Sequence, residues 1–285
     1  MPQALDLAYL VAVWVTLWAT AVGSGLSHRP SEVVRAASNS RRFASIVVLN
    51  AVAIPLVVAA LTRALAVPDG YAAGLIIVGA ASAGSLGLTS VRIARADLPL
   101  AIGLIVVLEV GNILAIPVWS TILLSGVAQP RPSEILTTLV LGVLLPLGVG
   151  QGIRVLLPAR AQGWAHVLAL VSIVGFIGVI GLILVRDMKE VIEAWKDLVP
   201  VVAAATVAVA LFAGWAVGGP TRESRLSASL VTSVRSNTPA LAVASATYGA
   251  TSDAASAIVV FALTSLTISG FLAIWLSRPT SRQPG

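Results

Sequence analysis

The stretch of sequence that most clearly indicates the fold is polar and interrupts an apolar run. It reads Thr232-Ser233-Val234-Arg235-Ser236-Asn237-Thr238-Pro239. The interruption lies inside residues 224–250, which are long enough to cross a bilayer. Arg235 is about 11 residues into that run, roughly 17 Å from its start and therefore near the membrane midplane. Polar backbone at that depth is tolerated only where it lines protein or a water-filled cavity, so we expect the helix to break here.

The composition of the whole chain is that of a membrane protein. Of its 285 residues, 58% are hydrophobic and 11% are charged, compared with about 25% charged in a typical soluble domain. The charged residues gather between the apolar runs, which excludes a soluble globule and leaves no room for a catalytic domain outside the membrane. The fold class is therefore all-α and polytopic. About nine transmembrane helices are predicted, at residues 5–26, 43–66, 70–96, 98–126, 133–157, 163–185, 197–218, 224–250 and 254–276.

The basic residues predict how these spans are oriented. One side carries twelve of them: Arg29, Arg35, Arg41, Arg42, Arg92, Arg95, Arg154, Arg160, Arg222, Arg225, Arg278 and Arg282. The other side carries five: Arg63, Arg131, Arg186, Lys189 and Lys196. Because cytoplasmic loops are rich in Lys and Arg, we expect the N-terminus outside, the C-terminus in the cytoplasm and the chain in the cell (inner) membrane. The net charge of +6 then reflects topology, and we expect no nucleic-acid partner.

A second, weaker interruption occurs in residues 70–96, at Ser82-Ala83-Gly84-Ser85-Leu86-Gly87. Small residues here also suit close helix packing, so the segment alone leaves both interpretations open. Taken with the break near Arg235, it gives one interrupted span in each half of the chain. That pattern is typical of a transporter whose solute binds where two broken helices cross.

Three polar residues lie deep in predicted spans. A charge at the bilayer centre costs about 2.5–3.5 kcal/mol, so we expect Arg235 to be functional or paired, and Glu109 to be protonated or to face a partner. An ion pair between Glu109 and Arg235 satisfies both, as a structural or as a gating element. Asn50, shortly before Pro55, is the third, and an interhelical hydrogen bond is its more frequent role.

Several site chemistries are disfavoured. The chain has no Cys and two isolated His residues, so we expect no metal site and no cofactor. An intramembrane lipid-modifying enzyme needs paired acids, histidines, or a nucleophile with its base, and only scattered groups are present. A passive channel is a further alternative, although a site closed at the midplane suits a transporter better.

The order of motifs resembles the bile acid:sodium symporter family. The matching motifs are Val22-Gly23-Ser24-Gly25-Leu26, Ile54-Pro55-Leu56, Gly74-Leu75-Ile76-Ile77-Val78-Gly79, Ala94-Arg95-Ala96-Asp97, Ser236-Asn237-Thr238-Pro239-Ala240 and Ile268-Ser269-Gly270. The resemblance implies inverted repeats of a ten-helix fold that here lacks its first helix. It also implies one transmembrane domain over residues 1–285, divided into a panel (5–26 and 133–185) and a core (43–126 and 197–276).

The departures from the family concern sodium. The resemblance places the ligands of one sodium ion at Gly87, Leu88, Ala101 and Ile105. It places the ligands of the other at Asn50, Thr232 and Ser236. The first set has no side-chain oxygen and the second has no carboxylate, so we expect transport without sodium. A sodium-coupled symporter with a rebuilt ion site is the alternative.

The expected function is therefore secondary transport of a small organic anion by alternating access through the lipid bilayer, with a proton as a candidate coupling ion. Beside the altered sodium site, Arg235 either replaces the positive charge of the ion or binds the anion through its planar donor groups. The residues expected to bind or gate the solute are Arg235, Glu109, Asn237, Ser236, Thr232, Asn50, Ser82, Ser85 and Thr238.

Overall fold

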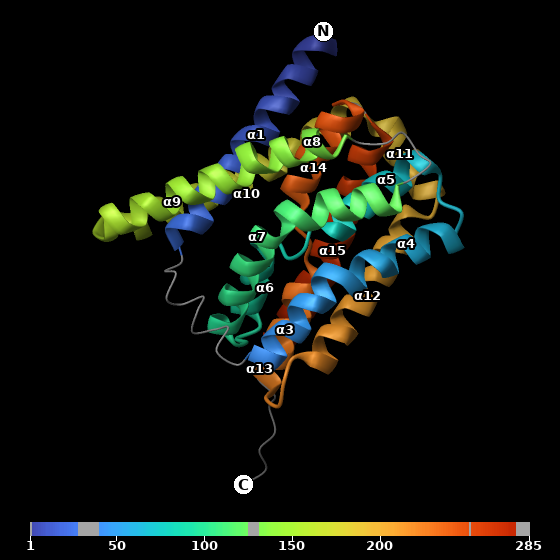
Figure 1. Cartoon of the computed structure of the whole chain (residues 1–285). Coiled ribbons are helices and arrows are strands. Elements are labelled where there is room, and N and C mark those ends of the chain that lie inside the picture. The colour runs from blue at the N-terminus through green and yellow to red at the C-terminus, as the bar shows by residue number, and fades with distance from the viewer. Residues whose placement is uncertain (1, 28–39, 125–130, 251, 278–285) are drawn as a thin grey trace.

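In a computed structural model the chain is an all-helical membrane protein (Figure 1). The structure describes residues 2–27, 40–124, 131–250 and 252–277. Of the residues used to predict topology, Arg29, Arg35, Arg278 and Arg282 lie outside these ranges. Within them, seven helices are long and apolar enough to cross a membrane. Each of the other two predicted spans, 70–96 and 224–250, is divided into two shorter helices.

The spans are built from the following elements. In chain order these are α1 (Pro2–Ser27), α3 (Ser40–Val48), η1 (Leu49–Ala53), α4 (Ile54–Ala64), α5 (Asp69–Ala80), α6 (Leu86–Ile93), α7 (Leu98–Leu123), α8 (Pro132–Leu139), η2 (Val140–Leu144), α9 (Leu145–Leu156), α10 (Pro158–Arg186), α11 (Met188–Lys196), α12 (Val199–Val217), α13 (Arg222–Ser233), α14 (Asn237–Tyr248) and α15 (Asp253–Ser277). The elements η1 and η2 are π-helical turns inside the second and fifth spans, and α11 is a short helix in the charged segment after α10.

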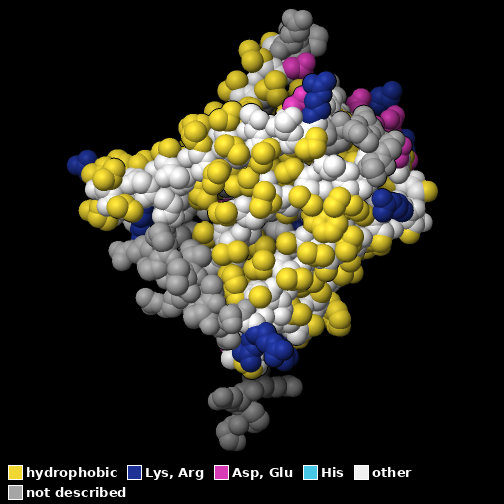
Figure 2. Space-filling view, viewed as in Figure 1, with side chains coloured by type: hydrophobic (Ala, Val, Ile, Leu, Met, Phe, Trp, Pro, Cys, Tyr) yellow, Lys and Arg dark blue, Asp and Glu magenta, His cyan; other side chains and the backbone are white. Residues whose placement is uncertain are grey.

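The surface has the distribution of side chains that a bilayer requires. Figure 2 shows hydrophobic side chains over the middle of the molecule, with Lys and Arg at the lower end and charges of both signs at the upper end. Large apolar side chains point outward, and Phe212 is 77% exposed. In water such a surface would aggregate, whereas hydrocarbon solvates it. The exposed apolar belt therefore supports a membrane-spanning arrangement.

The helices pack in two neighbouring groups. The first span, α1, lies along α10 and against α9. The other group contains α12 packed on α13 and α15, and α5 packed on α15. In Figure 1, α9 and part of α10 extend to the left of this second group. The interrupted helices belong to the second group, and their breaks lie near its centre.

Both interruptions predicted from the sequence are present, and they cross. Residues 81–85 separate α5 from α6, and residues 234–236 separate α13 from α14. The Ser236 amide donates to the Ala81 carbonyl oxygen at 3.0 Å, and the Gly84 amide donates to the Val234 carbonyl oxygen at 3.0 Å. Each break thus supplies partners for backbone groups that the other leaves unpaired inside the membrane.

Gly84 sets how closely the two breaks approach. A Cβ atom at this position would lie 2.6 Å from the Arg235 carbonyl oxygen, well inside van der Waals contact. The atom in the way is backbone and cannot rotate aside. Glycine is therefore required for the crossing, in contrast to Gly111 on α7, where a Cβ would meet nothing within 4 Å.

We predict that Gly84→Ala lowers the melting temperature of the purified protein, because the added methyl group separates the breaks and weakens both backbone hydrogen bonds. Each hydrogen bond of this kind contributes about 1 kcal/mol. Gly111→Ala is the matched control and should be neutral or stabilising by up to about 1 kcal/mol, since alanine favours the helix. A Gly84→Ala protein as stable as the control would contradict this account of the crossing.

Candidate functional site

The first break is held by an amide side chain that the sequence analysis did not select. Asn112 of α7 accepts from the Ser82 amide at 2.7 Å through Oδ1 and donates to the Ser82 carbonyl oxygen at 2.9 Å through Nδ2. Its side chain is buried. Both backbone groups of Ser82, which no helix satisfies, are paired in this way. The sequence signal that could have identified Asn112 is the presence of an amide side chain within an apolar span.

The Arg235 guanidinium lies within the crossing and is 1% exposed. Nη1 donates to Asn50 Oδ1 at 3.0 Å, and Nη2 donates to the Asn50 carbonyl oxygen at 3.3 Å and to the Gly79 carbonyl oxygen. Among the described residues no acceptor faces Nε. The cation is therefore bound by three neutral oxygen atoms, as a metal ion with oxygen ligands would be.

Asn50 connects Arg235 to three other parts of the site. It belongs to the π-helical turn η1, and turns of this kind are frequent at functional sites. Its Nδ2 donates to the Ile46 carbonyl oxygen at 3.0 Å and to Thr232 Oγ1 at 2.9 Å. Its carbonyl oxygen also accepts from Ser82 Oγ at 3.1 Å. Asn50, Thr232, Ser82 and Arg235 thus form one buried polar network.

Helix dipoles add to the stabilisation of this cation. Gly79 lies in the last turn of α5, and α13 ends at Ser233, two residues before Arg235. The C-terminal end of a helix carries a partial negative charge. Because two such ends meet beside the guanidinium, the crossing favours a positive charge at this place without a carboxylate.

The predicted ion pair between Glu109 and Arg235 is wrong. Glu109 Oε2 instead accepts from Ser24 Oγ of α1 at 2.7 Å. None of the ion pairs found among the described residues contains either Glu109 or Arg235. Arg235 obtains its acceptors from η1 and α5, while the Glu109 carboxylate faces α1, so the two charges are directed to different neighbours.

Two adjoining cavities border the crossing. The larger, of about 140 Å³, has a mixed lining of apolar and polar side chains; the polar residues are Thr20, Ser24 and Ser27 of α1, Ser85, Thr89 and Arg92 near α6, and Ser172 of α10. The smaller, of about 30 Å³, is lined by Thr20, Ser85, Ser172, Arg235, Ser236, Asn237 and Thr238 among others. Thr20, Ser85 and Ser172 border both, so the cavities meet between α1, α10 and the crossing.

Asn237 presents an unengaged amide to the smaller cavity. Its side chain is 4% exposed, and neither Nδ2 nor Oδ1 has a partner among the described residues. It is the first residue of α14, so the free amide groups of the first turn lie beside it. A buried amide left unpaired is unfavourable, which makes this position receptive to a ligand with both donor and acceptor atoms.

The nine candidate residues from the sequence thus separate into three places. The buried network contains Arg235, Asn50, Thr232 and Ser82, and the wall of the smaller cavity contains Ser85, Ser236, Asn237 and Thr238, with Arg235 reaching both. Glu109 forms the third place: it contacts Ser24, which lines the larger cavity, but Glu109 is not itself part of that lining. The hydroxyl groups contributed by α1 were missed. Two of them, Thr20 and Ser24, continue a four-residue spacing that begins at Thr16, which places these hydroxyl groups along one face of an apolar helix.

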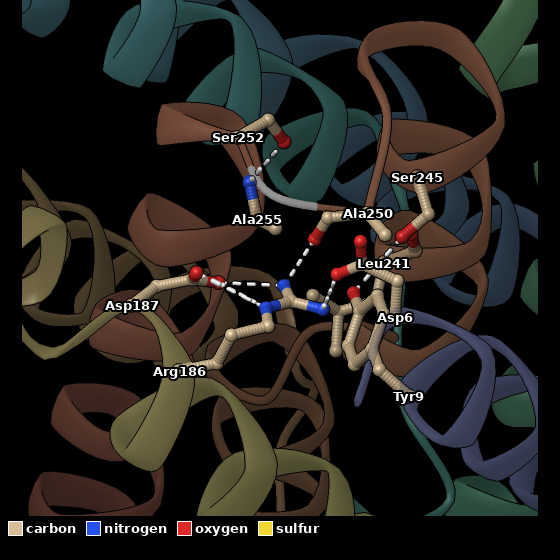
Figure 3. A network of polar contacts seen from close by, with 9 residues as sticks. All are labelled: Asp6, Tyr9, Arg186, Asp187, Leu241, Ser245, Ala250, Ser252 and Ala255. Carbon is tan, nitrogen blue, oxygen red and sulfur yellow. Dashed lines mark hydrogen bonds and ion pairs between the residues drawn. The ribbon is translucent and has the colours of Figure 1, made fainter. Parts of the chain in front are cut away.

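A second polar network lies at the other end of α1 and α10 (Figure 3). The Arg186 guanidinium is 8% exposed and pairs with Asp187 at 2.6 Å and with Asp6 at 3.2 Å. It also donates to the Ala250 carbonyl oxygen, in the connection between α14 and α15. Arg186 therefore ties the ends of α1 and α10 to the other helix group.

Tyr9 forms a second link at the same end. The Arg186 guanidinium lies 4.5 Å from the centroid of its ring, a cation–π arrangement. The Tyr9 hydroxyl is 2.9 Å from Ser245 Oγ on α14, as Figure 3 shows. On this side, therefore, α1 and α14 are in direct contact, whereas the cavities separate the same two helix groups near the opposite end of α1.

Comparison with known proteins identifies a family. No curated protein matches the chain in sequence. The model of the sodium bile acid symporter family matches residues 15–194, which is more than half of the chain. The match confirms the resemblance inferred from the motifs and extends from the middle of α1 through most of α11, including the first break. The chain belongs to the sodium bile acid symporter family.

Proposed function

Members of this family are transporters, and we propose that this chain moves a small organic anion across the cell membrane by alternating access, without sodium. The observation that carries the proposal is the pair of crossed, broken helices beside two cavities whose linings include polar side chains. Crossed half-helices at mid-depth are the usual solute site of secondary transporters. The ends of these half-helices carry partial charges that are already in place before the solute binds.

The charge of the proposed solute follows from what borders the smaller cavity. The half-helices α6 and α14 both begin there, next to Ser85 and Asn237. Helix N-termini favour anions through their free amide groups and positive partial charge. Arg235 Nε and Asn237 Nδ2 add donors that no described acceptor uses. An anionic group suits the smaller cavity, and a hydroxyl-bearing body suits the larger one.

Arg235 supports independence from sodium. The family resemblance places sodium ligands at Gly87, Leu88, Ala101 and Ile105, none of which has a side-chain oxygen. At the other site, Asn50 and Gly79 already coordinate the guanidinium. We propose that this tethered cation performs the structural role of the ion: it neutralises the helix ends and holds the crossing together.

Alternating access requires two bodies that move against each other. We propose that α1, α8, α9 and α10 form the panel and the remaining spans the core. The close packing of α1 on α9 and α10 supports this division. With the N-terminus outside, the Arg186 network lies on the extracellular side and the cavity at Arg92 toward the cytoplasm. The present arrangement then corresponds to a transporter closed to the outside.

The proposed function is tested by binding and then by uptake. We predict that at least one small organic anion raises the melting temperature of the purified protein. At 100 times its dissociation constant, the anion should raise the free energy of unfolding by about 2.7 kcal/mol. Its uptake into proteoliposomes should be unchanged when choline replaces sodium. Saturable dependence on sodium would favour the rebuilt sodium site instead, and the absence of any stabilising anion would count against an anionic solute.

A second prediction concerns the tethered cation. Arg235→Ala removes three hydrogen bonds from a charged donor, each worth about 1.5–3 kcal/mol, and leaves their oxygen acceptors buried. We expect a lower melting temperature that sodium, but not choline, partly restores, because a small cation can occupy the same oxygen atoms. Arg63→Ala is the control: it removes an exposed arginine that donates to the Leu123 carbonyl oxygen, and its stability should not respond to sodium.

If Arg235→Ala does not fold, Arg235→Lys provides the same test. The lysine ammonium keeps the charge but lacks the planar fork that reaches both Asn50 and Gly79. We expect it to fold with reduced stability and without a response to sodium, since the site stays occupied by a cation. A Lys variant that is stabilised by sodium would contradict the replacement of the ion by Arg235.

A third prediction concerns closure at the Arg186 network. In this cysteine-free chain, Ser245→Cys introduces one thiol at a buried position. A membrane-impermeant maleimide added from outside should label it slowly. Adding Arg186→Ala removes the link to Ala250 and should increase the labelling rate several-fold. Arg131→Ala, which removes an exposed ion pair with Glu134, is the control and should have no effect. Equal labelling in all three proteins would refute closure by this network.

A further inference from the structure

Glu109 is the one acidic residue among the described residues that lies midway along a membrane-spanning helix. It occupies the centre of α7 and is 6% exposed. Its single hydrogen-bond partner among the described residues is Ser24 Oγ, at 2.7 Å. The network around Arg235 does not use this carboxyl group, and neither does the anion site proposed above. Its presence at this depth therefore needs another explanation.

No counter-charge compensates Glu109 within the described residues. The titratable groups on the helices packed against α7 and α1 are Arg41, Arg42, Asp69, Tyr71, Arg92, Glu134, Arg154, Arg160, His166, Arg186, Arg222, Glu223, Arg225 and Tyr248. Those on α1, on α7's own N-cap and at the crossing are Asp6, Tyr9, Asp97 and Arg235. None of them pairs with Glu109. Among these, Arg154 donates to the Leu26 carbonyl oxygen, and Arg92 lines the larger cavity.

The larger cavity reaches the carboxyl group through one hydroxyl. Ser24 lines this cavity while contacting Glu109, and Ile105, one turn before Glu109 on the same face of α7, lines it as well. Water in the cavity can therefore exchange a proton with Glu109 by way of the Ser24 hydroxyl. A buried acid with a route to water on one side is the arrangement of a proton-binding site.

The contact between Glu109 and Ser24 also joins the two proposed bodies, since α7 belongs to the core and α1 to the panel. When the core moves, the Ser24 hydroxyl leaves, and an ionised carboxylate would remain without a donor in an apolar surrounding. Such a state is strongly unfavourable, whereas the neutral acid is tolerated. Movement and protonation of Glu109 are thus linked by the loss and recovery of one hydrogen bond.

We infer that Glu109 binds the proton that accompanies the anion through the transport cycle. When Glu109 is turned away from Ser24, water that reaches it in that state gives a proton to a carboxylate oxygen. It leaves to water in the larger cavity when the bond to Ser24 forms again. This inference rests on the proposed transport function, because it names the coupling ion of the same transporter. One proton carried with one monovalent anion makes the cycle electrically neutral.

The test combines a measurement on the protein alone with one on transport. Infrared difference spectra of the purified protein at a series of pH values should contain the carbonyl stretch of a protonated carboxyl group that titrates. Glu109→Gln should remove this band, while the control Glu134→Gln, at an exposed acid, should retain it. Persistence of the full band in Glu109→Gln would overturn the inference.

In proteoliposomes, an inward gradient of about one pH unit should raise accumulation of the anion about tenfold if one proton accompanies each anion. Glu109→Gln should lose this response yet still exchange labelled for unlabelled anion, whereas Glu134→Gln should keep both activities.

If Glu109→Gln does not fold, Glu109→Asp should keep the infrared band and the gradient response. A Gln variant that still responds to the gradient contradicts the inference. Failure of every variant to transport any anion contradicts the proposed function, while the infrared result still decides whether Glu109 binds a proton.

Discussion

Backbone amide and carbonyl groups cannot be left unpaired in the interior of a bilayer, and the rest of this structure follows from how two broken helices meet that constraint. Each break exposes groups that its own helix no longer pairs. The bonds between Ser236 and Ala81 and between Gly84 and Val234 pair one break with the other. Asn112 then pairs both groups of Ser82. The crossing is possible only because the two segments are complementary, and their side chains are brought to one place as a result.

The same crossing determines why a cation is needed at its centre. Carbonyl oxygens of α5 and η1 converge where helix C-termini already carry partial negative charge. A bound ion could neutralise this negative charge. The Arg235 guanidinium does so without dissociating, because it is covalently attached to the chain. In the transport cycle proposed above, a fixed cation gives up the energy that a sodium gradient could supply. The proposed cycle therefore draws on another source of energy, either the gradient of the solute itself or a proton.

The sequence predicted the positions of the helices and their breaks better than it predicted the contacts between side chains. The depth of Arg235 and the proline at 239 located one break, and the small residues 82–87 located the other, because helix-breaking chemistry is local. The partner of Glu109 was not predictable in the same way. Depth along a helix can be counted from the sequence, but the rotation of α7 about its axis depends on packing against α1. The hydroxyl groups of α1 were recognisable by their spacing, although only the packing of α1 on α10 shows that they line a cavity.

The surroundings of the two buried charges suit them to the different roles that we propose for them. Arg235 has three oxygen acceptors, all from η1 and α5 within the proposed core, so its stabilisation does not depend on a contact with the proposed panel. Glu109 has one donor, and that donor sits on the opposite side of the joint between the two helix groups. A group whose stabilisation depends on a contact that motion must break is suited to change its charge during the motion. A group held entirely within one body is suited to keep it. Had the two residues formed the expected ion pair, both charges would have been neutralised together, and neither the fixed cation nor the exchangeable proton that we propose would be available.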